Sequence, residues 1–135
     1  MEKLWSPEYE VGNESIDNHH RELFTLTKML DEAFGEDPRT EIEKIVVFLE
    51  AYVIEHFQEE ENLMRKHKYN GLDHHRVEHE IFRSRVTLLR KYFNDKIPNT
   101  KLMFYIRQCI DKLVDHVLTV DIGIASIAKH SHRHR

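Results

Sequence analysis

Histidine and glutamate side chains recur in this sequence at spacings that suit metal binding. The chain holds eleven histidines among its 135 residues. His56 and Glu60 are four residues apart, as are His75 and His79, and residues four apart lie on one face of a helix. Each pair can therefore direct two ligand atoms to the same side. Imidazole together with carboxylate suits iron, copper, nickel or zinc, so the pattern predicts a site for such a metal.

These polar residues continue stripes of apolar residues that are spaced three or four residues apart, as on one face of a helix. Leu49 and Val53 lead to His56, and Leu113 leads to His116. Two further stripes, in other parts of the chain, begin with His20 and with the pair His75 and His79. A single inward histidine is more often a core residue bonded to a carbonyl than a ligand. Five histidines and a glutamate on four stripes favour a metal site, because an apolar core does not tolerate unpaired polar groups.

Asp121 is a further candidate whose spacing is ambiguous. It follows His116 by five residues, which in an unbroken helix rotates it about 140° away from that histidine. Either Asp121 is an exposed acid, or the helix ends between the two residues and the chain turns back. Gly123 allows such a break. The spacing alone leaves both interpretations open.

Seven candidate ligands exceed what one ion accepts, so two ions fit better than one. We assume that Glu60 and Asp121 each bridge the ions with both oxygens and that an oxo or hydroxo group is shared. Together with five histidines this fills about eleven of the roughly twelve positions of two octahedral ions. The odd number of histidines therefore predicts an asymmetric site with one position open to a small ligand.

The other histidines are predicted to be solvated. His19 and His74 neighbour inward residues, and one step along a helix rotates a side chain by about 100°. His67 and His130 extend no apolar stripe. The histidines of residues 130–135 form either a weak metal-binding tract or an incidental polar end, and a chain terminus favours the second.

Glycine and proline divide the chain into four long stretches that contain neither residue. These stretches are long enough for helices and show no strand-like alternation. Thr40 and Glu43 have the form of a capping box at the start of the second helix. Short loops between helices predict an all-α, antiparallel up-down-up-down four-helix bundle. Its expected parts, in one domain of residues 1–135, are an N-terminal extended arm, four helices, and a short C-terminal helix or tail: 1–15, 17–36, 40–67, 72–94, 98–119 and 122–135.

Composition narrows the class of protein. With 40% hydrophobic and 33% charged residues the chain is typical of a globular domain. A net charge of −4 argues against a nucleic-acid binder. No apolar run is long enough to span a membrane, and no secretory signal is visible, so a cytoplasmic protein is expected. One cysteine excludes an internal disulfide, and Cys109 lies on an apolar stripe as a small buried hydrophobe.

Taken together, these motifs resemble those of a hemerythrin of the bacterial type, over nearly the whole chain. Residues 5–12 are similar to the family's N-terminal arm, and residues 16–23 match its first ligand motif, with His20 at the ligand position. Residues 56–60 match the second motif, which assigns ligation to Glu60 rather than Glu59. Tyr69 followed by His75 and His79 matches the third, and residues 116–121 match the last, which implies that Asp121 is a bridging ligand. One departure is that His19 stands where the family usually has glutamine.

The resemblance implies a di-iron centre that binds dioxygen reversibly. It places His75, His79 and His116 on one iron and His20 and His56 on the other. The bridges between the Fe²⁺/Fe³⁺ ions would be an oxo or hydroxo group, Glu60 and Asp121. Leu113, one turn before His116, is a candidate apolar wall of the oxygen pocket, with ordinary core packing as the alternative.

Three functional classes remain open on the sequence. The first is an oxygen carrier, store or delivery protein, which is not an enzyme. The second is an oxygen or redox sensor that acts on an unidentified protein partner. The third is a di-iron oxidoreductase acting on peroxide, nitric oxide or ferrous iron. Dioxygen is the expected ligand in the first class. Neither a nucleic acid nor a membrane is expected as a partner.

Overall fold

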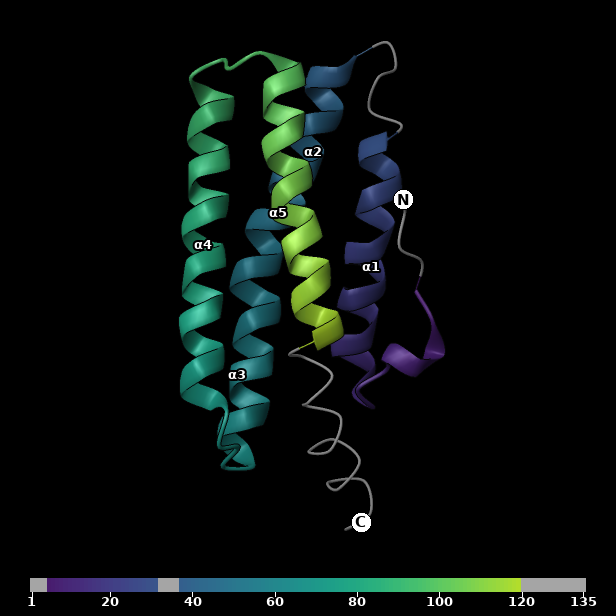
Figure 1. Cartoon of the computed structure of the whole chain (residues 1–135), viewed down its shortest axis with the longest axis vertical. Coiled ribbons are helices and arrows are strands. Elements are labelled where there is room, and N and C mark those ends of the chain that lie inside the picture. The colour runs from purple at the N-terminus through teal and green to yellow at the C-terminus, as the bar shows by residue number, and fades with distance from the viewer. Residues whose placement is uncertain (1–4, 32–36, 120–135) are drawn as a thin grey trace.

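Four long helical rods lie side by side in the structure, which is a computed structural model that describes residues 5–31 and 37–119 (Figure 1). The first rod is α1 (Glu14–Asp31). The second runs from α2 (Pro38–Ala51) through the π-helical segment η2 (Tyr52–His56) into α3 (Phe57–Lys66). The third and fourth are α4 (Leu72–Asn94) and α5 (Asn99–Thr119). The predicted all-α four-helix bundle is confirmed.

Three of the four helices begin one to three residues away from their predicted starts, and the second of them begins at Pro38 rather than at residue 40. The first helix starts at Glu14 rather than at residue 17, because the Asn13 side chain accepts a hydrogen bond from the backbone N–H of Ile16 at 3.1 Å. Its predicted end at residue 36 lies outside the described residues. The third helix spans 72–94 as predicted, and the fourth starts at Asn99, one residue late.

The predicted capping box at the second helix is wrong. Asp37, not Thr40, is the N-cap, and Pro38 occupies the first helical position. The Asp37 carboxylate accepts hydrogen bonds from both the hydroxyl and the backbone N–H of Thr40, at 2.6 and 3.2 Å. These two bonds lower the pKa of Asp37 below its ordinary value. The sequence at this point offers two capping residues three apart, and proline at the first helical position favours the earlier one.

The π segment changes which side chains the second rod directs inward. A π turn holds one more residue than an α turn and is frequent at functional sites. Buried side chains accordingly occur here as neighbours, Tyr52 with Val53 and His56 with Phe57. Arg83 of α4 donates from Nε to the carbonyl oxygen of Val53 at 3.1 Å. This hydrogen bond connects the backbone of the π segment to the adjacent rod, close to His56 at the end of the segment.

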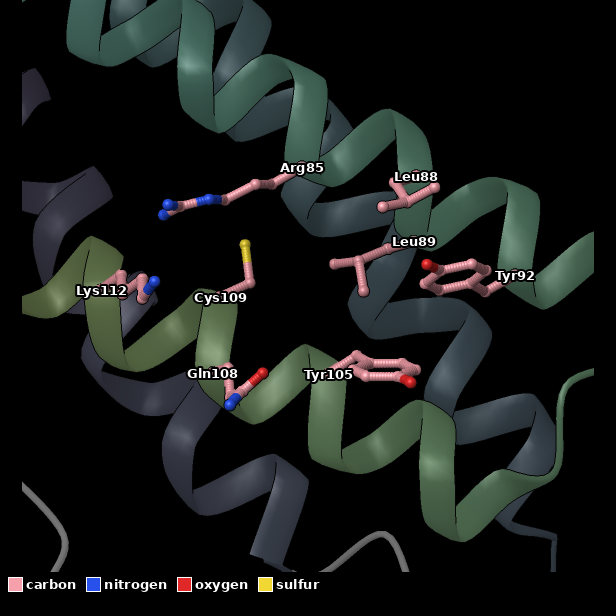
Figure 2. Close-up of a pocket in the computed structure, with 8 residues that line it drawn as sticks. All are labelled: Arg85, Leu88, Leu89, Tyr92, Tyr105, Gln108, Cys109 and Lys112. Carbon is pink, nitrogen blue, oxygen red and sulfur yellow. The ribbon is translucent and has the colours of Figure 1, made fainter.

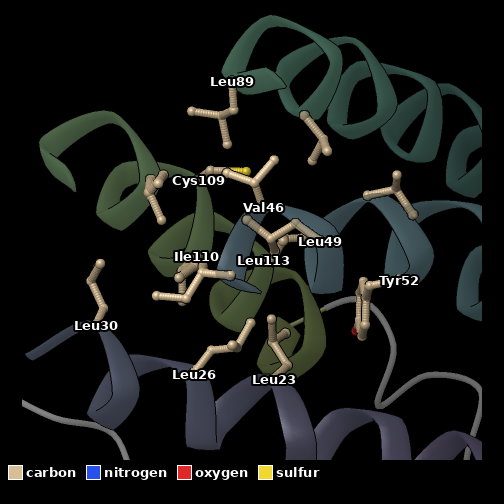
Figure 3. Packing of buried hydrophobic residues seen from close by; sticks show 14 of the residues in the cluster. Leu23, Leu26, Leu30, Val46, Leu49, Tyr52, Leu89, Cys109, Ile110 and Leu113 are labelled. Atoms are coloured by element: carbon tan, nitrogen blue, oxygen red, sulfur yellow. The ribbon is translucent and has the colours of Figure 1, made fainter. Parts of the chain in front are cut away.

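A large hydrophobic core lies between the rods (Figure 3), and a smaller cluster surrounds Met64. Leucine, isoleucine and valine from all four rods meet in the large core, and Leu113 lies among them. Cys109 is buried in this core as predicted, and it also borders a groove of 240 Å³ between α4 and α5 (Figure 2). Burial raises the pKa of its thiol to about 11, against the opposing effect of Arg85 and Lys112. The thiolate that reactive cysteines need is therefore scarce at neutral pH.

The N-terminal arm is fastened to α1 by polar and aromatic contacts. It contains a short 3-10 turn, η1 (Pro7–Tyr9). The buried Asp17 carboxylate accepts the backbone N–H groups of Val11 and Gly12 at 2.8 and 3.2 Å. Gly12 adopts a φ of 91°, a conformation that favours glycine. Among the described residues no helix has the length and apolarity of a membrane span, and a cytoplasmic location stays a prediction.

Candidate metal centre

Six of the seven predicted ligands meet at one buried place inside the bundle. They come from all four rods: His20 from α1, His56 from η2, Glu60 from α3, His75 and His79 from α4, and His116 from α5. Their potential ligand atoms form two groups, and within each group the atoms lie within 4.8 Å of one another. The first group is Glu60, His75, His79 and His116, and the second is His20, His56 and Glu60.

Glu60 is the residue common to both groups. Its Oε2 lies 3.4 Å from His20 Nε2 and 3.4 Å from His56 Nε2. Its other oxygen, Oε1, lies 3.3 Å from His79 Nε2. One carboxylate therefore faces two histidines with one oxygen and a third histidine with the other. This is the arrangement of a carboxylate that bridges two ions.

Burial makes an ordinary core role for these groups unfavourable. The Glu60 side chain is 0% exposed, and the five histidines are buried too. Nε2 of His56 and Nε2 of His79 make no hydrogen bond within the described part of the chain. Polar atoms buried in this way cost free energy unless they are satisfied. Neutral imidazole nitrogens and a carboxylate directed to common points fit metal ions, and their chemistry suits iron.

The outer nitrogen of His79 is held by a carboxylate that the sequence pattern did not indicate. His79 Nδ1 lies 2.8 Å from Oε2 of Glu61, which is buried. Arg83 donates to the same Glu61 oxygen at 3.2 Å. A carboxylate on the outer nitrogen fixes the ring's orientation and leaves Nε2 free to coordinate. Glu61 directly follows Glu60 on α3, and its contact with His79 of α4 reveals its role.

His116 has a similar carboxylate partner. Its Nδ1 lies 2.7 Å from Oε2 of Glu78, and the other Glu78 oxygen lies 2.9 Å from Nε2 of His74. The His74 side chain is 75% exposed, so its prediction as a solvated residue is confirmed. The sequence shows that Glu78 lies four residues after His74 and three after His75. It did not show that Glu78 would face a different helix.

His19 contradicts its prediction as a solvated residue. Its side chain is only 30% exposed, and its Nδ1 lies 3.0 Å from Nδ1 of His56. The expected rotation away from the inward face is present, but it points His19 toward the neighbouring rod rather than into solvent. His67 also differs from the prediction, since it is half-buried with its Nε2 enclosed.

Aromatic rings line the two histidine groups. Phe57 stacks on His79 with ring centroids 3.8 Å apart and planes 2° from parallel. Tyr52 stacks on His56 at 4.4 Å, and Trp5 lies at 6.4 Å from His20. These rings restrict the rotation of the imidazoles and limit access of water. Their spacing in the sequence is typical of any helical core, so it did not distinguish them as site residues.

Asp121 and Leu113 are the remaining residues of the predicted site. Asp121 and the histidine tail, including His130, lie outside the described residues. Leu113 is buried in the same hydrophobic core as Leu49 and Leu23 (Figure 3). Its place one turn before His116 on α5 agrees with either of its two predicted roles.

Comparison with known proteins gives a consistent result. The family model described as the hemerythrin HHE cation binding domain matches residues 11–125. The chain is 32% identical to a bacteriohemerythrin of Clostridium acetobutylicum over 126 residues, which cover 87% of this chain and 95% of that protein. It is 27% identical to a myohemerythrin of Sipunculus nudus over 118 residues, 87% of each chain. It is 30% identical to a bacteriohemerythrin of Methylococcus capsulatus over 107 residues, 78% of this chain and 79% of that protein. No solved structure matches the chain significantly.

Proposed function

Because the chain belongs to the hemerythrin family, we propose that its buried cluster holds two iron ions and binds dioxygen reversibly. The role is that of an oxygen carrier, store or delivery protein. The observation that carries the proposal is the position of Glu60 between two groups of histidines. Each carboxylate oxygen faces a different group, as a bridging ligand requires.

The proposed ligand sets are unequal. His75, His79 and His116 hold one ion, while His20 and His56 hold the other, and Glu60 bridges both. The two groups of buried ligand atoms support this division. Asp121 is proposed as the second bridge on the basis of the family motif in the sequence. The ion with two histidines then has fewer protein ligands, and it offers the open position for a small molecule.

The residues around the site favour binding over further chemistry. When bound, two iron ions supply one electron each in a reversible oxidation. Five neutral imidazoles against two carboxylates stabilise the ferrous state more than a carboxylate-rich set would, because they donate no negative charge. Buried apolar neighbours, with Leu113 proposed among them, exclude the water and protons that would make oxidation irreversible.

An oxygen cycle on the reduced, iron-loaded protein tests this function. We expect exposure to dioxygen to give a coloured species, and removal of dioxygen under vacuum to restore the starting spectrum over several cycles. The metal-free protein, treated in the same way, should stay colourless. Prompt irreversible oxidation, or turnover with peroxide or nitric oxide, would instead indicate the oxidoreductase. A stable cycle accompanied by oxygen-dependent capture of a protein partner would indicate the sensor.

A further inference from the structure

We propose that His19 is a positioning residue for His56, and that as a neutral hydrogen-bond acceptor it supports its ligand less strongly than carboxylates support the ligands of the other ion. The inference rests on the proposed function, since it takes His56 as an iron ligand. It assigns a role to the residue that departs from the family's usual glutamine. His19 does not enter either group of ligand atoms. It acts from the outer side of the His56 ring.

His19 contacts His56 directly, and Glu59 lies on the other side of the His19 ring. His19 of α1 and His56 of η2 face each other through their Nδ1 atoms at 3.0 Å, with the ring planes at 84°. Glu59 lies on the other side of His19, with Oε2 at 3.7 Å from its Nδ1. Ser15 donates its hydroxyl to the same Glu59 oxygen at 3.0 Å. The His19 ring is therefore confined between α1 and the second rod.

Metal binding by His56 determines the direction of this hydrogen bond. If Nε2 of His56 coordinates iron, the ring's proton must lie on Nδ1. His56 Nδ1 then donates to Nδ1 of His19, which must be the unprotonated nitrogen of its ring. The remaining His19 proton lies on Nε2. The distance of 3.7 Å between His19 Nδ1 and Glu59 agrees with this, because two acceptors do not form a hydrogen bond.

The two ions differ in the charge of the groups behind their ligands. His79 is backed by the Glu61 carboxylate and His116 by the Glu78 carboxylate. His56 is backed by a neutral imidazole instead. A carboxylate raises the basicity of the histidine that donates to it, and a neutral acceptor does so less. His56 therefore has a weaker outer partner than His79 and His116 have, and its ion also has fewer histidines, so we expect that ion to be held less tightly.

Release of iron to a chelator tests both parts of the proposal. The diferrous protein is mixed with excess ferrozine, and the coloured iron complex is followed with time. We expect two phases in the wild type, with the two-histidine ion in the faster one. His19→Ala should accelerate the fast phase by at least about 10-fold and leave the slow phase unchanged, because outer partners contribute about 10–100-fold to metal affinity. His19→Gln should restore the wild-type rate, since its amide oxygen can accept the same hydrogen bond.

Glu78→Gln is the matched control, because it changes the outer partner of His116 on the other ion. It should accelerate the slow phase alone. A fast phase unchanged in His19→Ala, or an equal acceleration of both phases, would overturn the proposal, as would a single phase in the wild type. Thermal unfolding of each variant separates a general loss of stability from loss of one ion. These rates do not depend on whether oxygen binding is reversible, so failure of the oxygen cycle remains distinguishable.

Discussion

Replacing Glu60 with glutamine is expected to abolish the di-iron centre. Glu60 is the only described residue that belongs to both groups of ligand atoms. Glutamine has nearly the same shape, but it lacks the charge and offers one acceptor oxygen in place of two. Loss of an outer partner costs about 10–100-fold in metal affinity, so loss of a shared direct ligand should cost at least about 100-fold at each ion. Iron per chain, measured by atomic spectroscopy after gel filtration, should fall close to zero.

Glu59→Gln is the matched control for this experiment. Glu59 is the preceding residue, it is also a glutamate, and its side chain is 34% exposed. We expect it to retain both ions, with helical content in both variants equal to that of the wild type by circular dichroism. Full iron retention by Glu60→Gln, or equal losses in the two variants, would contradict the bridging role.

Removing the His79 imidazole, by His79→Ala, is expected to reduce iron from two ions per chain to one or fewer. His79 is one of three histidines proposed for its ion, and its Nε2 lies 3.3 Å from the shared Glu60. The substitution also removes the ring that stacks on Phe57 at 3.8 Å. His79→Gln is therefore a useful second variant, because it keeps most of the side-chain volume. Iron analysis and the visible spectrum of the oxygenated protein measure the outcome.

The exposed His74 on the same helix provides the control. His74→Ala should keep both ions, because the side chain is 75% exposed and pairs with Glu78 rather than with the ligand atoms. If His74→Ala and His79→Ala lose iron equally, the assignment of inward and outward faces on α4 is wrong.

Helical periodicity predicted the inward faces well, and the reason is physical. Four buried stripes in a bundle have one interior to share, so residues that extend those stripes must meet there. His20, His75, His79 and His116 follow this rule without exception. The choice of His20 over His19 and of His75 over His74 depends only on the rotation of about 100° between neighbouring residues of a helix, which the sequence encodes directly.

Features that depend on two helices at once could not be predicted in the same way. The partners of the outer nitrogens, Glu61 for His79 and Glu78 for His116, are set by how the rods are rotated against each other. The rotation of His19 about its helix axis follows from the sequence, so His19 was expected in solvent. The sequence did not show that His56 of the neighbouring rod lies on that side. The π segment that ends at His56 is a further case, since no propensity in its five residues distinguishes it from an α-helix.

The metal content of the purified wild-type protein tests the central claim most directly. Two ions sharing one carboxylate require a ratio of two irons per chain, bound together and lost together in Glu60→Gln. We predict that ratio in protein reconstituted with ferrous iron and freed of excess metal. A limit of one ion per chain, or a preference for a single zinc over iron in competition, would contradict the account.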